Sequence, residues 1–190
     1  KIIVKTNVIL KKKKKKWVSI VAPKEFGSAE LGESFVAEAS ELKGRKIDVS
    51  LSNLGRGKNS SIKLIFKVDE IADGKGIVNV VGYYIMDSFA RRIIRKGRTK
   101  VNGVYKSKTK DNINVILKLV LCTQNIVPAR ISKPLRAETE KIVADFLKNN
   151  TFPKILDSII MYQFQKNIKK DLSKIYPVAS LEIISFKKSF

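Results

Sequence analysis

The sequence contains no histidine and only one cysteine, Cys122, in 190 residues. The missing histidine removes the side chain that most often transfers protons near neutral pH and that most often ligates metals through imidazole. A single cysteine cannot form an internal disulfide or a Cys-x-x-Cys metal site, and a free thiol favours a reducing, cytoplasmic compartment. We therefore expect no metal, no other cofactor and no enzymatic activity.

Acidic residues are also scarce relative to basic ones. The chain has 39 Lys and Arg against 17 Asp and Glu, a formal charge of +22. No apolar run approaches the roughly 20 residues that span a membrane. Hydrophobic residues make up 44% of the chain, enough to bury a core. A net positive charge of this size needs a polyanionic partner, and nucleic acid is the commonest one.

The positive charge is concentrated in two segments. Residues 1–16 carry a net +8 and residues 88–137 a net +12, whereas residues 17–87 are close to neutral and residues 138–190 carry +3. This distribution is typical of a binding face together with an anchoring arm. We expect residues 1–16 to form a basic arm, either disordered or ordered by RNA, and residues 17–190 to form a single domain.

Hydrophobic periodicity predicts that most of the globular part is strand. Period-two alternation runs through residues 47–51, 62–68 and 113–121, and residues 77–86 are almost continuously apolar. The expected turns between strands are Gly55-Arg56-Gly57, Asp73-Gly74-Lys75-Gly76 and Asn102-Gly103. Short turns between strands favour a meander or a barrel.

Three helices are expected beside these strands. The first covers about residues 88–96, with Gly97 as its stop, and the second runs from near Ser132 to Asn149. The third begins after Thr151 and carries its apolar stripe as far as Ile168. A last strand covers about residues 178–186. The fold class expected is α+β, and the short link between the two longer helices predicts an antiparallel pair packed on the sheet.

The basic block supplies the candidate binding residues. Residues 88–110 hold nine basic residues and no acid, and a helix over residues 88–96 would place four of them on its polar side. Arginine makes bidentate contacts to phosphate and lysine supplies point charges. The candidate RNA-binding residues are Lys11, Lys12, Lys13, Lys14, Lys15, Lys16, Trp17, Lys43, Arg45, Arg91, Arg92, Arg95, Lys96, Arg98, Lys100, Lys106, Lys108, Lys110, Arg130, Lys133 and Arg136. Because aromatic residues are sparse near them, we expect contacts to phosphate and sugar on folded RNA.

Other readings of the same residues stay open at this point. The basic block could be a solvated face, and the chain could be a free RNA- or DNA-binding accessory protein. An enzyme acting on nucleic acid would need a carboxylate cluster for metal, and the basic block offers only Asp111. Binding to a membrane surface is disfavoured because the lysine arm lacks an apolar face. Cys122, in an apolar strand without histidine to activate it, is expected to be an inert core thiol.

Four short blocks resemble a known family. They are Lys16-Trp17 followed by Ala22-Pro23 and Phe26; Leu42-Lys43-Gly44-Arg45 with Val49-Ser50-Leu51 and Leu54; Lys108-Thr109-Lys110-Asp111; and Ile168 and Lys170 followed by Ile175-Tyr176-Pro177-Val178. Together and in this order they resemble the small-subunit ribosomal protein family of archaea and eukaryotes known as "S-three-Ae", which bacteria lack. Two departures are Asn112, where the family usually has Gly, and Phe164-Gln165-Lys166 in place of Ile-Gly-Lys.

The resemblance implies a mainly antiparallel, β-barrel-like core flanked by about three helices. It also implies a structural place in the small ribosomal subunit, on the platform side near the 3′ region of the small-subunit rRNA and the messenger exit. The implied partners are small-subunit rRNA, neighbouring platform proteins, messenger RNA and initiation factors. No catalytic residue follows from the resemblance.

Overall fold

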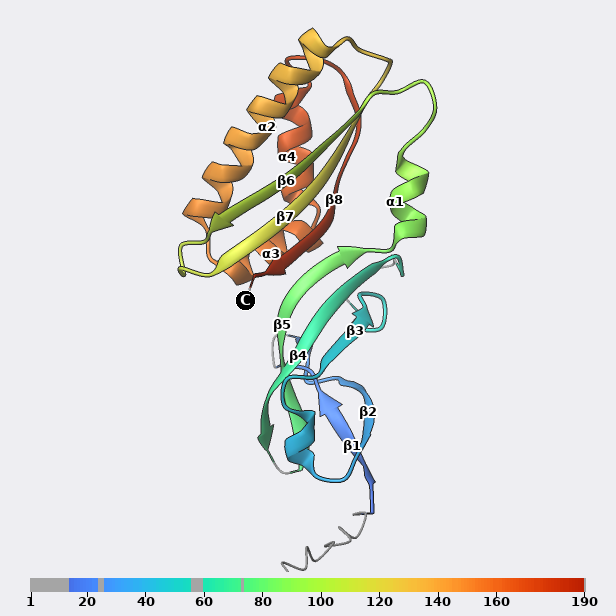
Figure 1. Cartoon of the computed structure of the whole chain (residues 1–190), viewed down its shortest axis with the longest axis vertical. Helices are drawn as coiled ribbons and strands as arrows, with labels where there is room; N and C mark the ends of the chain where they lie inside the picture. The colour runs from blue at the N-terminus through green and yellow to red at the C-terminus, as the bar shows by residue number, and fades with distance from the viewer. Residues whose placement is uncertain (1–13, 24–25, 56–59, 73, 190) are drawn as a thin grey trace, which may run out of the picture. The chain divides into compact units, whose positions relative to one another are not determined.

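The computed structural model describes residues 14–23, 26–55, 60–72 and 74–189. These residues cluster into two compact units (Figure 1). Unit 1 comprises the described parts of Lys1–Lys46 and Lys67–Asn79, and unit 2 comprises the described parts of Ile47–Phe66 and Val80–Phe190. Lysines 11 to 13 of the expected arm lie outside the described residues, and Lys16 is already the first residue of a strand.

Unit 1 is built on a two-stranded antiparallel ribbon. Strands β1 (Lys16–Val21) and β2 (Glu30–Val36) pair with Trp17 opposite Phe35. The start of β5 (Lys75–Ile85) runs parallel to β1. Its Gly76 leaves room for a small core, since a Cβ there would lie 3.4 Å from Val68 and 3.7 Å from Leu42. Leu42 ends the 3-10 helix η2 (Ala39–Leu42) and is fully buried.

Unit 2 contains an antiparallel sheet whose side chains alternate between two faces, apart from register shifts in the β7–β8 pair at Lys118/Leu119 and Cys122/Thr123. β6 (Lys100–Lys108) pairs with β7 (Asn114–Thr123), β7 pairs with β8 (Val178–Lys188), and β8 pairs with the end of β5. Among the described strands β6 pairs only with β7, so β6 is an edge strand. The side chains of one face are apolar and buried: Val101, Val115, Leu117, Leu119, Leu121, Leu181, Ile183 and Phe186.

Three helices cover that apolar face (Figure 1). They are α2 (Ala129–Asn149), α3 (Phe152–Ile160) and α4 (Gln163–Leu172). Phe152 stacks on Phe186 of β8 at 5.1 Å between ring centroids, and Phe146 stacks on Phe164 at 3.8 Å. Full burial of such a side chain contributes about 1.5–3 kcal/mol each. The core of unit 2 therefore lies between the helical layer and one side of the sheet.

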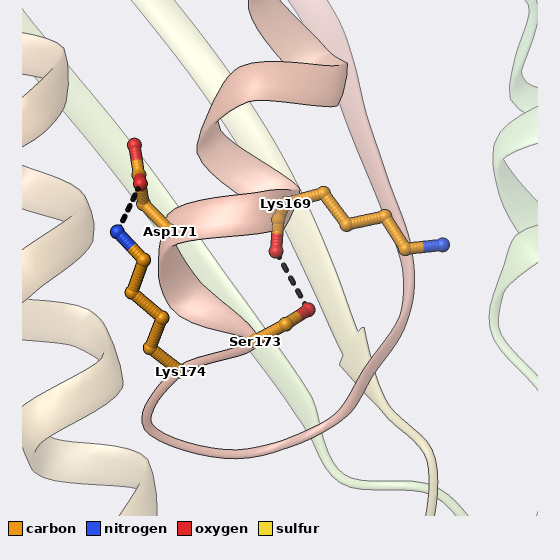
Figure 2. A network of polar contacts seen from close by, with 4 residues as sticks. All are labelled: Lys169, Asp171, Ser173 and Lys174. Carbon is orange, nitrogen blue, oxygen red and sulfur yellow. Dashed lines mark hydrogen bonds and ion pairs between the residues drawn. The ribbon is translucent and has the colours of Figure 1, made fainter.

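The end of α4 is fixed by local polar contacts (Figure 2). The Ser173 hydroxyl donates a 2.7 Å hydrogen bond to the Lys169 carbonyl, and Lys174 pairs with Asp171 at 2.9 Å. The Lys169 ammonium group points away from both and donates to the Ala179 carbonyl at 2.9 Å. These contacts add to the Ser173 backbone N–H, which already donates to the Lys169 carbonyl at 3.0 Å. They also tie α4 to the start of β8.

The α+β class is confirmed, and the barrel is only a loose description. β3 (Lys46–Ser50) and β4 (Ile62–Ala72) complete the strands, and β4 pairs with both β3 and β5. Along the main path the described strands pair in the order β2-β1-β5-β8-β7-β6, which is open at both ends. The β1–β5 pair is parallel and the β1–β2, β5–β8, β6–β7 and β7–β8 pairs are antiparallel, so the sheet is mixed.

Two helix predictions need correction. The first helix, α1 (Asp87–Ile93), ends before Gly97 because Ile94 is already extended, with φ −86° and ψ 108°. The third expected helix is two helices, α3 and α4, because Tyr162 adopts a left-handed conformation at φ 61° and interrupts the hydrogen-bond ladder. An apolar stripe indicates which helix face is buried, but it does not indicate a single left-handed residue that divides one helix into two.

The turn predicted at Asn102-Gly103 is wrong. Both residues lie inside β6 and pair with Val120 and Leu119 of β7. A Cβ at Gly103 would collide with the phenol of Tyr105, so this glycine makes space for a neighbouring ring. By contrast, Asn112 does adopt left-handed backbone, at φ 58°, where the resembling family usually has glycine.

No helix among the described residues is long and apolar enough to cross a membrane.

Candidate nucleic-acid interface

The second face of the unit 2 sheet carries lysines. Alternation along β6 places Lys100, Lys106 and Lys108 opposite the helix-covered side, and all three are exposed. Cross-strand pairing adds Lys118 of β7, which lies opposite Val104, and Lys187 of β8, which lies opposite Ile116. We call these five lysines the basic sheet face. Within the described chain none of them has a carboxylate at ion-pair distance.

Lys118 and Lys187 were missed by sequence reasoning. The alternation along β7 could have identified Lys118, because it is the polar residue in an otherwise apolar strand. Lys187 lies in the last two residues of β8, beyond the expected end of that strand at residue 186. It rests over the ring of Tyr84 at 5.5 Å, and the Tyr84 hydroxyl donates a 3.0 Å hydrogen bond to Asp48. Burial and this hydrogen bond raise the pKa of Tyr84, so the phenol stays protonated.

Helix α1 and the loop after it bring further arginines to this sheet. Arg91 and Arg92 lie in the last turn of α1, whereas Arg95 and Lys96 lie beyond its end, so the four do not share a helix face as expected. A hollow is lined by Phe89, Arg92, Ile93, Arg95, Arg98 and Ser180. Ser180 pairs with Cys122, and Cys122 pairs with Lys100, so the hollow lies on the lysine-bearing side of the sheet.

Acidic side chains near these cations are already engaged. Asp111 accepts a 3.0 Å hydrogen bond from the backbone N–H of Phe152 and so caps the start of α3. Glu182 of β8 accepts a 2.6 Å hydrogen bond from the Tyr162 hydroxyl. Burial raises the pKa of Glu182, against the opposing effects of this hydrogen bond and of Lys169. The positive field of the block is thus not cancelled internally.

The structure separates a second group of candidates from this face. Arg130, Lys133 and Arg136 are exposed on α2, which belongs to the helical layer on the other side of the sheet. Tyr105 of β6 faces that layer, and its pKa is raised by burial and by Glu140 and lowered by Arg136. Lys110 is exposed in the turn after β6, where its backbone N–H donates to the Asn150 carbonyl at 3.2 Å. The α2 cations therefore do not extend the basic sheet face.

Unit 1 presents its own cluster. The rings of Trp17 and Phe35 lie next to each other across β1 and β2, tilted by 42° with 5.0 Å between centroids, and they are 67% and 48% exposed. The Lys15 ammonium lies 5.8 Å from the Phe35 centroid. Lys14, Lys16, Lys43 and Arg45 are exposed in the same unit, and Arg45 donates a 2.8 Å hydrogen bond to the Ser34 hydroxyl. An exposed aromatic pair with lysine beside it was not anticipated, since Phe35 was not among the candidates.

Comparison with known proteins gives the family. The model of the Ribosomal S3Ae family matches residues 4–188, nearly the whole chain. The chain belongs to the Ribosomal S3Ae family. Family membership makes it a cytoplasmic ribosomal protein with a structural role, and it is not an enzyme.

Individual relatives of the S3Ae family agree along most of the length. The chain is 29% identical over 172 residues to "Small ribosomal subunit protein eS1" of Picrophilus torridus, covering 90% of this chain and 82% of the relative. It is 26% identical over 179 residues to the protein of the same name from Haloquadratum walsbyi, covering 93% and 84%. The Methanothermobacter thermautotrophicus protein of that name is 25% identical over 173 residues, covering 90% and 89%.

Cys122 is buried in β7, 1% exposed. In the part of the chain that the structure describes, no three His, Cys, Asp or Glu residues gather as a metal site would need. Asp69 of β4 accepts a 2.9 Å hydrogen bond from the Asn79 side-chain amide.

Proposed function

We propose that this chain is a structural component of the small ribosomal subunit that binds small-subunit rRNA through the basic sheet face. The single observation that carries this is the asymmetry of the unit 2 sheet: three helices cover one face, and the other displays lysines that have no carboxylate partner among the described residues. A lysine in that position neutralises an RNA phosphate and releases a condensed counterion. The names of the S3Ae relatives point to the small subunit as the site of binding.

Unit 1 contributes a second contact of a different kind. Trp17 and Phe35 offer π-faces on which unpaired bases stack, and Lys14, Lys15 and Lys16 supply charge beside them. The remaining candidates, including Lys43, Arg45 and the α2 cations, are proposed as peripheral phosphate contacts. The sequence alone predicts contacts only to phosphate and sugar on folded RNA. For unit 1 we propose base stacking in addition.

We also propose a position within the subunit. The resemblance to the family supports a seat on the platform side, near the 3′ region of the small-subunit rRNA and the messenger exit. Neighbouring platform proteins, messenger RNA and initiation factors would lie within reach there. Cross-linking in purified small subunits, followed by mapping of the linked nucleotides, tests this: links confined to another region of the rRNA would refute the position.

The rRNA-binding proposal is tested by removing the same number of positive charges from two different surfaces of unit 2. The test variant is Lys100→Gln/Lys106→Gln/Lys108→Gln, which removes three charges from β6. The matched control is Lys148→Gln/Lys154→Gln/Lys166→Gln, which removes three charges from exposed positions of the helical layer. Affinity for an rRNA fragment is measured as a function of salt concentration for both variants.

The two variants should behave differently. Each lysine contact to a duplex phosphate contributes roughly −0.9 to the slope of log affinity against log salt concentration. If each of the three β6 lysines makes one such contact, the slope of the test variant should be shallower than that of wild type by about 2–3. The control should keep the wild-type slope nearly unchanged. Equal losses in the two variants would show that only net charge matters, and would contradict the basic sheet face.

A further inference from the structure

The hollow beside α1 has the composition of an anion site. Its volume is about 380 Å³, and its lining combines Arg92, Arg95 and Arg98 with Ser180 and two apolar residues, Phe89 and Ile93. The volume lies within the range of about 300–1,000 Å³ that is typical of sites for small organic ligands. It therefore has room for more than a phosphate group.

The three arginines are brought together by the local backbone. Arg92 lies in the last turn of α1, and its guanidinium lies 5.5 Å from the Phe89 ring centroid. The chain leaves the helix at Ile94 and turns at Gly97, which adopts φ 80°. That turn returns Arg98 to the hollow, where its side chain is half-buried.

None of the three guanidinium groups is neutralised inside the described part of the protein. No carboxylate lies at ion-pair distance from Arg92, Arg95 or Arg98 there, and none of their side chains makes a hydrogen bond. Like charges held close together repel one another, and a bound phosphate offsets that repulsion with charge-assisted, often bidentate hydrogen bonds. A phosphate bound in the hollow would therefore supply the counter-charge that these three guanidinium groups lack among the described residues.

Ser180 supplies an independent observation at the same place. Its hydroxyl oxygen is buried and has no hydrogen-bond partner among the described residues. Buried hydroxyl groups are almost always hydrogen-bonded, so the Ser180 hydroxyl has an unused donor at the wall of the hollow. A hydroxyl can donate to a phosphate or sugar oxygen.

We propose that this hollow binds one unpaired nucleotide of RNA. The phosphate lies among Arg92, Arg95 and Arg98, the Ser180 hydroxyl donates to a phosphate or sugar oxygen, and the base packs against Phe89 and Ile93. The inference rests on the proposed rRNA-binding function and adds selectivity to it, because the basic sheet face recognises only phosphates. A nucleotide paired within an A-form helix cannot offer its base to the hollow, so an extruded nucleotide is selected.

The test uses the full chain and two RNA hairpins that differ in one bulged adenosine. Wild-type protein should bind the bulged hairpin at least about tenfold more tightly, since stacking and charge-assisted hydrogen bonds are each worth about that much. Arg95→Gln/Arg98→Gln should abolish this preference, and Ser180→Ala, which keeps every charge, should reduce it. The matched control Lys148→Gln/Lys154→Gln should keep it.

Failure of this inference is distinguishable from failure of the rRNA-binding proposal. The Lys100→Gln/Lys106→Gln/Lys108→Gln variant should weaken both hairpins equally and preserve the preference. Equal wild-type affinity for both hairpins, with the β6 lysines still required, would overturn the nucleotide site alone. Saturable binding of adenosine monophosphate without any preference for the bulged hairpin would also overturn it, because the hollow would then hold free nucleotide.

A second measurement keeps the inference testable inside the subunit. Phe89 is replaced by p-benzoylphenylalanine, and assembled small subunits are irradiated. The expected product is a cross-link to a single unpaired rRNA nucleotide. A cross-link to a neighbouring protein, or to nucleotides within a regular helix, would overturn the assignment.

Discussion

Trp17 is the only tryptophan of the chain, and two-thirds of its surface is open to solvent. An exposed tryptophan is uncommon on a free surface and is enriched where proteins bind partners. Its neighbours decide the kind of partner. Phe35 supplies a second ring and Lys15 a charge close to that ring, a combination that suits a base and its phosphate.

Trp17 also reports on its own occupancy. We predict that single-stranded RNA quenches the tryptophan emission, because a stacked base lies directly against the indole. Trp17→Ala should cost about 1–3 kcal/mol of binding free energy, the usual value of one stacked base. Fluorescence titration gives the first result and filter binding the second. Met161→Ala, which removes an apolar side chain 60% exposed in the helical layer, is the control. Unchanged emission at saturating RNA would refute stacking.

Single residues also explain where sequence reasoning failed. Asn102-Gly103 has the sequence of a hairpin turn, yet the phenol of Tyr105 occupies the space beside Gly103 and the strand continues. The residue types of a turn motif cannot reveal that the ring of Tyr105, two residues away, leaves no room for a side chain at position 103. Asn112 is a different case, because it adopts left-handed backbone where the family usually has glycine, a conformation that asparagine tolerates.

At the level of elements, strands with clear alternation were predicted well and irregular ends were not. β7 could be predicted from period-two burial, because every second residue from Val115 to Leu121 is apolar and faces the helical layer. The break between α3 and α4 could not be predicted, because Tyr162 is held there by tertiary contacts. Its hydroxyl donates to Glu182 at 2.6 Å, and it also lies 3.3 Å from the Leu181 carbonyl.

This contact between Tyr162, at the junction of α3 and α4, and Glu182 of β8 predicts a pH dependence of stability. Burial raises the pKa of Glu182, while Tyr162 and Lys169 oppose the shift. An acid whose pKa is raised on folding stabilises the fold below its ordinary pKa, and that contribution is lost as pH rises toward the folded value. Glu182→Gln stays neutral and can still accept the bond from Tyr162. We therefore expect it to gain stability over wild type as pH rises above about 4.5.

Urea unfolding at about pH 4 and about pH 7 checks this. The difference in free energy of unfolding between Glu182→Gln and wild type should be smaller at the lower pH. There the glutamate of the wild type is largely protonated, so it is as uncharged as the glutamine of the variant. Glu140→Gln, on the exposed side of α2, is the control for removing a surface charge. A Glu182→Gln variant that is less stable than wild type at neutral pH, but not at acidic pH, would show that the carboxylate is stabilising.

At the level of the whole molecule, the sequence identified the basic block but not its division. The charge count marked residues 88–137 as a unit, whereas folding sends Lys100, Lys106 and Lys108 to one side of a sheet and Arg130, Lys133 and Arg136 to the other. A count of charges along the chain cannot show this division, because β6 and α2 are close in sequence but carry their charges on opposite sides of the sheet. Lys118 and Lys187 join the first group through strand pairing.

Association with the ribosome gives a prediction at this scale. The full chain should co-migrate with small subunits in sucrose gradients at low and moderate salt, because many phosphate contacts act together. Lys100→Gln/Lys106→Gln/Lys108→Gln should dissociate at lower salt than wild type, and the helical-layer triple variant should not. A chain that stays at the top of the gradient even at low salt would behave as an accessory nucleic-acid-binding protein instead.

The position of β6 at the margin of its sheet has a consequence before any RNA is bound. Among the described strands β6 has one neighbour, so the other side of its backbone presents free N–H and C=O groups. Such a margin can recruit a second copy of the chain and start aggregation. Lys100, Lys106 and Lys108 lie along it, and two copies approaching margin to margin would bring these like charges together. The side chains proposed to hold RNA in the assembled particle thus also keep the newly made protein from self-association until RNA is available.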